Sequence, residues 1–221
     1  MEYIKSIHSL LFPSKNWCFF CKEKNNFITN YICDDCKDNI EILNREIDLD
    51  SVKVDKAFYV LGFNRFIKEL IYDFKFNGKS YLYKPLAQIM VDSIEPLNLA
   101  SDIDLICFVP SHRRKEAIRG YNQSELLAKY VSKKLDIKLS VDNIVKYRFT
   151  KEQNKLNRNQ RMNNLKDSFE IKRPEEFIGK NILIIDDIVT TGSTFIECAK
   201  VLKKSGAREI TALALTSSKK Y

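Results

Sequence analysis

The sequence has no long hydrophobic run. Among its 221 residues no 18 consecutive positions are apolar, so we expect no membrane-spanning helix. Residues 1–12 place Ile4, Ile7 and Leu11 at helical spacing among polar residues, just before Pro13. This pattern predicts an amphipathic helix and not a secretory signal peptide. We therefore expect a cytoplasmic protein, in which structural disulfides between its cysteines do not form.

Internal repeats and low-complexity tracts are also absent, which excludes a repeat architecture and a largely disordered chain. The length instead suits one α/β domain and a small module. Apolar patterns predict strands that alternate with helices, and hence a doubly wound, mostly parallel sheet with right-handed crossovers. The expected strands are 57–62, 105–109, 144–147, 181–185 and 209–215, and the expected helices are 63–76, 81–94, 124–135 and 194–204.

Acidic residues are scarce in the larger part of the chain. Residues 1–56 hold 8 Lys and Arg against 10 Asp and Glu, whereas residues 57–221 hold 29 against 19, a net charge of +10 there. A basic surface attracts nucleic acid, but it also suits a small polyanion. Charge alone leaves both kinds of partner open.

Four cysteines near the N-terminus form two CxxC pairs separated by eleven residues: Cys18, Cys21, Cys33 and Cys36. Two such pairs can surround one tetrahedral Zn²⁺ as a closed, structural four-thiolate site. The segment is too short to bury a core, so the metal would supply its folding energy. A redox dithiol pair is the alternative. We expect an N-terminal helix and zinc module over residues 1–45, a linker over 46–56, and the α/β domain over 57–221.

Residues 182–194 carry the most specific pattern. An apolar run ends in Asp186 and Asp187, and a glycine follows at position 192 just before an expected helix. Parallel sheets bind ligands beyond the carboxyl ends of their strands, and helix N-termini bind anions. The acids suit sugar hydroxyls or hydrated Mg²⁺, so the pattern predicts a phosphorylated sugar; a strand end capped by solvated acids is the alternative. The loop adds the hydroxyls of Thr190, Thr191, Ser193 and Thr194.

At these residues the chain resembles the type I phosphoribosyltransferases. The resemblance implies that Asp186 and Asp187 hold the ribose hydroxyls of phosphoribosyl pyrophosphate (PRPP), and that the loop from Thr190 to Thr194, including Gly192, holds its 5′-phosphate. It also implies that Mg²⁺ accompanies PRPP.

A second cluster follows the strand expected at 105–109. Four basic residues within positions 113–119 suit a pyrophosphate group; a solvated basic loop is the alternative. Pro110-x-His112 followed by Arg119-Gly-Tyr-Asn-Gln123 is similar to the ComF family, whose members are linked to DNA uptake in natural competence and carry an N-terminal four-cysteine module. The family usually has Arg where this chain has Lys115. The candidate pyrophosphate residues are Ser111, His112, Arg113, Arg114, Lys115 and Arg119.

A third segment, residues 148–169, is rich in basic side chains, and between Lys146 and Lys166 seven basic residues accompany one acid. Its pattern is similar to the ComF family, and in phosphoribosyltransferases the corresponding region is a mobile flap over PRPP. An open flap would also present a positive tract to single-stranded DNA. The candidate residues are Arg148, Lys155, Arg158 and Arg161.

The ComF resemblance favours a competence protein that handles single-stranded DNA, alone or with other DNA-uptake proteins, and retains a PRPP site. The alternative is an active phosphoribosyltransferase with an unidentified acceptor. Only six residues follow the last expected strand, so a hood over an acceptor would have to come from the start of the domain or from the zinc module. No residue is identified as catalytic.

Overall fold

The computed structural model describes residues 16–99, 102–148, 165 and 167–219. The helix expected over residues 1–12 and the candidate residues Lys155, Arg158 and Arg161 lie outside these ranges. Within the described ranges, no helix has the length and apolar character needed to cross a membrane.

The main sheet has five strands in the order β3-β4-β9-β8-β5. The four strands from β4 to β5 are parallel, and β3 joins the edge antiparallel to β4. The apolar run of β8 lies between β9 and β5. A parallel strand that is buried on both faces carries apolar residues at consecutive positions, without polar residues between them. The strands are β3 (Ile42–Glu46), β4 (Lys56–Leu61), β5 (Leu105–Phe108), β8 (Asn181–Val189) and β9 (Glu209–Ser217).

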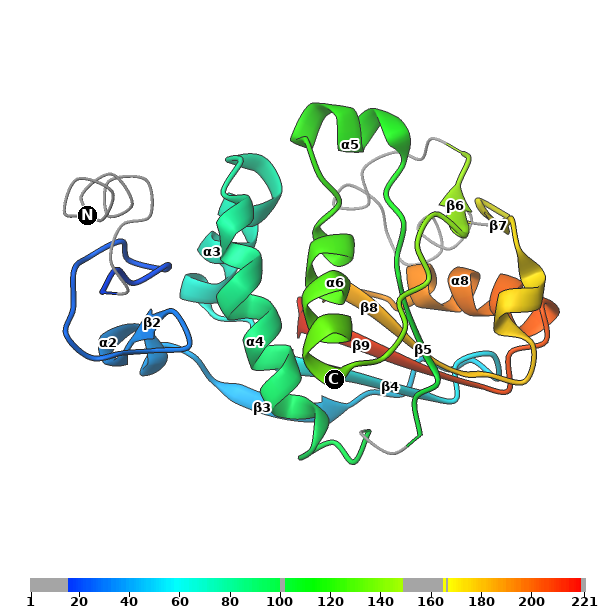
Figure 1. The fold of residues 1–221 in the computed structure, drawn as a ribbon, viewed down its shortest axis with the longest axis horizontal. Coiled ribbons are helices and arrows are strands. Elements are labelled where there is room, and N and C mark those ends of the chain that lie inside the picture. Colours follow the sequence, from blue (N-terminus) through cyan, green and yellow to red (C-terminus); the bar gives the residue numbers. More distant parts are fainter. Residues whose placement is uncertain (1–15, 100–101, 149–164, 166, 220–221) are drawn as a thin grey trace, which may run out of the picture.

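Helices cover both faces of this sheet, as expected for a doubly wound fold. Alternate strand residues face opposite cores: Ile106 and Leu183 belong to one, Cys107 and Ile184 to the other. The first core is covered by α3 (Arg65–Phe76), α4 (Tyr83–Ile94) and α6 (Gln123–Leu135), and the second by α8 (Ser193–Lys204). Figure 1 shows α4 and α6 crossing the same face of the sheet. Shorter helices are η1 (Ser80–Leu82), α5 (Arg113–Arg119) and η3 (Pro174–Phe177).

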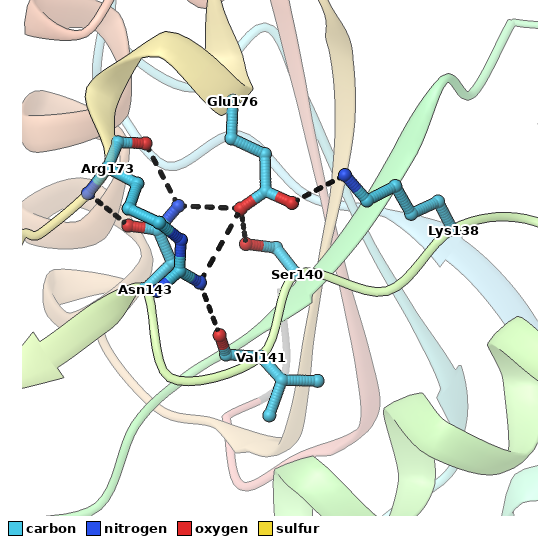
Figure 2. A network of polar contacts seen from close by, with 6 residues as sticks. All are labelled: Lys138, Ser140, Val141, Asn143, Arg173 and Glu176. Atoms are coloured by element: carbon cyan, nitrogen blue, oxygen red, sulfur yellow. Dashed lines mark hydrogen bonds and ion pairs between the residues drawn. The ribbon is translucent and has the colours of Figure 1, made fainter.

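The strand expected at 144–147 differs from the prediction in its partner. The observed β6 (Ile144–Lys146) lies outside the main sheet and pairs antiparallel with β7 (Phe169–Ile171). A polar network fixes this pairing (Figure 2). Asn143 Nδ2 donates to the carbonyl of Arg173 at 3.0 Å, and the backbone N–H of Arg173 donates to Asn143 Oδ1 at 2.8 Å.

Glu176 in η3 is the centre of that network. Its carboxylate accepts hydrogen bonds from Ser140 Oγ at 2.8 Å and Asn143 Nδ2 at 2.7 Å. Lys138 Nζ completes an ion pair with it at 2.9 Å. These contacts hold β6 and β7 against the domain from one side.

The stretch 46–56, predicted as a linker, packs into the domain instead. Three of its apolar residues, Ile47, Leu49 and Val54, are buried in the core on the α8 side, whereas Val52 is exposed. They are separated by charged residues that face outward, which is why the sequence resembles a polar connection. The chain therefore has no open linker at this point.

The cysteine module docks against α3, η1 and α4. It contains β1 (Ile28–Thr29), β2 (Ile32–Cys33) and α2 (Asp34–Lys37), and Figure 1 shows it beside α3 and α4. Phe20 meets Phe66 of α3 edge to face at 5.9 Å, and Phe19 meets Tyr81 at 5.7 Å. The module shares one continuous apolar core with these helices.

Candidate functional site

One cavity of about 500 Å³ opens at the carboxyl ends of β5 and β8. Its walls come from α3, the loop after β5, the start of α6, β6, and the loop from β8 into α8. This is the position at which open parallel sheets place their ligands. The cavity brings together side chains that are far apart in the sequence.

The two adjacent acids lie at the end of β8, and both line the cavity. Asp187 is buried, and its Oδ1 lies 2.9 Å from Lys75 Nζ of α3. Asp186 Oδ1 accepts hydrogen bonds from Ser124 Oγ at 2.7 Å and from the Asp187 backbone N–H at 2.9 Å. Each carboxylate therefore has one oxygen engaged by the fold, and its Oδ2 has no partner among the described residues.

Burial raises the pKa of Asp186 to about 7, and the charge of Asp187 adds to this effect. The hydroxyl of Ser124 and the ammonium group of Lys75 act in the opposite direction without cancelling it. The protonated form of Asp186 is therefore more favoured than it is in a solvated aspartate. A ligand that brings a cation or hydroxyl donors would relieve the repulsion between the two acids.

Gly192 precedes α8 with φ of 73°, in the left-handed region that favours glycine. A Cβ at this position would also lie 2.5 Å from Cδ2 of Leu49. The glycine is therefore required by the backbone and by the packing of the buried stretch before β4. This second requirement was not expected from the sequence, which related Gly192 only to ligand approach.

The hydroxyl residues around this glycine fall into two pairs. Thr190 and Thr194 line the cavity. The hydroxyls of Thr191 and Ser193 are hydrogen-bonded to each other at 2.7 Å, and neither residue lines the cavity. The first pair is placed to contact a ligand, whereas the second holds the loop in shape.

The basic segment after β5 forms a short helix, α5, where the sequence suggested a loop. Four of its six candidate residues line the cavity: Ser111, His112, Lys115 and Arg119. Arg113 and Arg114 are exposed and lie outside the lining. His112 caps α5, since its Nδ1 accepts from the Arg114 backbone N–H at 3.2 Å.

The residues that follow Arg119 have structural contacts. Tyr121 Oη and Gln123 Nε2 both donate to the carbonyl of Phe74, at 2.7 and 3.2 Å, and Asn122 Nδ2 donates to the carbonyl of Val109 at 3.1 Å. Tyr121 also stacks on the Phe74 ring at 5.9 Å. This segment therefore joins α3, β5 and α6 around the cavity.

Sequence reasoning missed several polar residues of the cavity, among them Lys75, Ser124 and Lys146. Lys75 and Ser124 contact the acid pair. The periodic patterns that predict their helices do not indicate which residues these side chains contact. Lys146 lies on β6 with its ammonium group 5.3 Å from the centroid of the Phe169 ring. Burial lowers the pKa of Lys146 to about 8, and the nearby charge of Lys115 contributes to this lowering.

Of the four flap candidates, the structure describes one, Arg148. Arg148 is exposed and does not line the cavity, and Lys155, Arg158 and Arg161 lie outside the described residues. The role of these side chains stays a prediction.

The four cysteines come together in a separate cluster, with all four sulfurs within 4.8 Å of one another. Cys21 Sγ and Cys33 Sγ are 3.8 Å apart. Tetrahedral Zn²⁺ with bonds of about 2.3 Å separates its sulfur ligands by about 3.8 Å. The donor set and its spacing therefore fit one zinc ion, with no disulfide among these cysteines.

The thiols of this cluster differ in acidity. Burial alone would raise the pKa of Cys18, but hydrogen bonds from the backbone N–H groups of Cys33, Cys21 and Phe20 lower it to about 7. Burial and the neighbouring sulfurs raise the pKa of Cys36. Four such sulfurs become thiolates together only when a cation offsets their charge.

Comparison with known proteins agrees with the fold and the cavity. Residues 122–220 match the family described as "Phosphoribosyl transferase domain". The chain is 34% identical over 151 residues to Competence protein F of Haemophilus influenzae, covering 66% of each protein. It is 30% identical over 152 residues to DNA utilization protein YhgH of Escherichia coli K12, covering 67% of this chain and 66% of that protein. It is 25% identical over 218 residues to Competence protein ComFC of Bacillus subtilis, covering 95% of this chain and 87% of that protein.

The matched segment spans slightly less than two thirds of the first two relatives. The fold, the cavity at the strand ends and the family match define a phosphoribosyltransferase-type domain. Its relatives include Competence protein F and Competence protein ComFC, and the chain also carries a four-cysteine cluster near its N-terminus.

Proposed function

We propose that the chain binds PRPP in this cavity and acts in natural competence, where it handles single-stranded DNA. The observation that carries the first part is the lining of the cavity. It joins the acid pair Asp186 and Asp187, the hydroxyls of Thr190 and Thr194, and the basic side chains of Lys115 and Arg119.

Each part of PRPP has a matching part in that lining. Carboxylate oxygens accept hydrogen bonds from ribose hydroxyls, and the Oδ2 atoms of both acids are available for this. The N-terminus of α8 offers backbone N–H groups and a favourable dipole to a phosphate. Lys115 and Arg119 suit the more highly charged diphosphate.

Magnesium fits the same place. Mg²⁺ is usually bound by one or two carboxylates, phosphate oxygens and water. Burial and the charge of Asp187 raise the pKa of Asp186, and a nearby cation would offset the repulsion between the two acids. Asp186 and Asp187 would hold it, directly or through water. Bound there, Mg²⁺ would offset the charge of the diphosphate.

Calorimetry with PRPP, with and without Mg²⁺, tests this proposal. The double variant Asp186→Asn, Asp187→Asn should weaken Mg²⁺-dependent binding at least tenfold, because two charged acceptors are removed. The matched control is Glu170→Gln, Glu175→Gln, which removes two charges from exposed residues outside the cavity. Unchanged affinity of the aspartate variant for PRPP would show that PRPP does not bind at Asp186 and Asp187.

The DNA part of the proposal rests on two observations of a different kind. The relatives are named for competence and for DNA utilization, and residues 57–221 carry a net charge of +10. A surface with that charge attracts a phosphate backbone without sequence preference. Binding of a labelled single strand at low salt, with loss of binding at high salt, is the expected result.

A second candidate function is transfer of the phosphoribosyl group to an acceptor. This function is favoured by three exposed aromatic residues that line the cavity at the start of the domain: Phe63, Tyr72 and Phe76. Aromatic rings at this place offer a face to a planar acceptor. Measuring pyrophosphate release from PRPP with free bases and with single-stranded DNA separates transfer from binding alone.

A further inference from the structure

One ion pair crosses from α3 to the acid pair of the cavity. Lys75 Nζ lies 2.9 Å from Asp187 Oδ1, and the two side chains are 18% and 7% exposed. Both residues line the cavity. The pair between Lys129 and Glu125 on α6, by comparison, has side chains that are 52% and 21% exposed. Because less water reaches the pair at the acids, its charges are screened weakly and interact strongly.

Lys75 is held in this position before any ligand arrives. Its neighbour Phe74 is buried. The carbonyl of Phe74 accepts hydrogen bonds from Tyr121 Oη at 2.7 Å and from Gln123 Nε2 at 3.2 Å. The backbone that carries Lys75 is therefore fixed against the start of α6. Its ammonium group occupies Asp187 Oδ1 at the cost of side-chain entropy alone.

The ammonium group lies where a divalent cation would bind. Mg²⁺ binds carboxylate oxygens directly or through its water molecules, and Asp187 Oδ1 already has a cation against it. A second cation at the same carboxylate is repelled by the first. The lining of the cavity is also positive overall, since it contains five basic residues but two acids. The basic residues are Lys68, Lys75, Lys115, Arg119 and Lys146.

This lining acts differently on a free divalent cation and on one that is bound to a polyanion. Free Mg²⁺ adds positive charge to a cavity that is already positive, and it must also compete with Lys75. Mg²⁺ that is carried by PRPP arrives with phosphate groups whose negative charge exceeds its own, so the cavity attracts the complex as a whole. That attraction offsets the cost of displacing Lys75 from Asp187.

We infer that Lys75 determines which cations reach the acid pair: it occupies Asp187 in the absence of ligand, excludes free divalent cations, and gives way to a cation bound to a polyanion such as PRPP. This inference rests on the proposed function, which places the cation at Asp186 and Asp187. Lys75 acts here through Asp187 and not on the substrate itself, so it is a positioning residue.

Calorimetry with magnesium chloride and with manganese chloride, without PRPP, tests this role. Lys75→Met should raise the affinity for each metal alone about tenfold, because a positive charge at the carboxylate is removed. Lys75→Arg keeps that charge and should bind the metals as weakly as the unaltered protein. The matched control is Lys68→Met, which removes the same charge from an exposed residue of α3 that also lines the cavity. Its affinity should stay within about twofold of the unaltered protein, because an exposed charge is screened.

The gain of metal binding should also appear in thermal unfolding. Lys75→Gln keeps a hydrogen-bond donor for Asp187, and it replaces Lys75→Met in the experiment if that variant does not fold. In either variant, added Mg²⁺ should raise the unfolding midpoint, whereas the unaltered protein should respond little without PRPP. Adding Asp187→Asn should abolish the gain, which would locate it at that carboxylate.

No gain of metal affinity in a folded variant of Lys75, or an equal gain in Lys68→Met, would overturn the inference. Binding of PRPP with Mg²⁺ by the unaltered protein would then leave the proposed function intact. If the Lys75 variants gain metal binding at Asp187 but the unaltered protein does not bind PRPP, the proposed function fails and the exclusion of free cations by Lys75 stands.

Discussion

Lys75 Nζ and Asp187 Oδ1 lie 2.9 Å apart, and both side chains are largely shielded from water. The ion pair joins the last turn of α3 to the end of β8. It therefore connects a helix that lines the cavity to the acid pair Asp186 and Asp187. It also places a positive charge beside the two adjacent carboxylates inside the domain. The pair is thus part of the fold as well as of the site.

Breaking this pair should be costly. Lys75→Met leaves a buried carboxylate without its cation, and we expect the free energy of unfolding to fall by about 3 kcal/mol. Lys129→Met is the control, because its pair with Glu125 is more exposed and is worth about 0.5 kcal/mol or less. Urea denaturation of both variants measures the difference. Equal small losses would show that Asp187 is solvated well enough to need no partner.

The stability of the chain should depend on pH through Glu176. Burial alone would raise the pKa of this carboxyl, but Lys138, Ser140 and Asn143 together lower it below 4.5. A lowered pKa in the folded state adds stability above the unfolded value, and this stability is lost as the pH falls through the folded value. Glu176→Gln should therefore be less stable than the unaltered protein at pH 7, with a gap that narrows below about pH 4.5. Denaturation at pH 7, 5 and 3.5 measures the gap, and Glu175→Gln should show none.

One zinc ion per chain is expected in the cysteine cluster. Cys33→Ser should remove the metal, because three thiolates no longer close the site, whereas Cys198→Ala should leave the zinc content unchanged. Metal analysis and thermal unfolding measure both. The module shares its core with α3 and α4, so loss of zinc should also destabilise those helices. A metal-free protein of unchanged stability would contradict this.

Gly192 should be intolerant of a side chain for two separable reasons. Gly192→Ala meets Leu49 and a φ of 73°, and we expect a loss of stability of about 2 kcal/mol. Adding Leu49→Ala should relieve the steric overlap but not the backbone strain, so the two effects should be less than additive. Strict additivity in a double-mutant cycle would show that the overlap with Leu49 has no energetic weight.

Single-stranded DNA should bind with little sequence preference and with an affinity that falls as salt rises. Neutralising Arg158 and Arg161 together should reduce the slope of log affinity against log salt by about one for each phosphate that they pair with. Millimolar PRPP should compete with the strand if the basic surfaces overlap. An affinity for DNA that does not depend on salt, or no DNA binding at low salt, would indicate that the net positive charge serves PRPP binding and not DNA binding.

The sequence predicted those parts of the molecule that local patterns determine. The run before Asp186 is buried on both sides, and its continuous apolar character follows from that burial. The four expected helices lie close to α3, α4, α6 and α8, since each presents one apolar face to the sheet. The cysteine pairs come together because their spacing allows a single cluster.

What the sequence did not predict depends on partners far along the chain. The pairing of β6 with β7 is supported by the hydrogen bonds between Asn143 and Arg173, and no local sequence pattern reveals that exchange. Residues 46–56 look polar, although Leu49 is buried beneath Gly192. Lys75 is one of many lysines in the sequence, and only the packing of α3 across the acids distinguishes it.

Helix α3 contacts the cysteine module through Phe66 and the acid pair through Lys75. The nine residues of helix from Phe66 to Lys75 span about 14 Å. A tilt of α3 by about 5° about its contact with the module would therefore displace the ammonium group of Lys75 by about 1 Å, which is enough to separate an ion pair. A shift of the cysteine module against Phe66 would therefore reach the ligand site, although no cysteine lines the cavity.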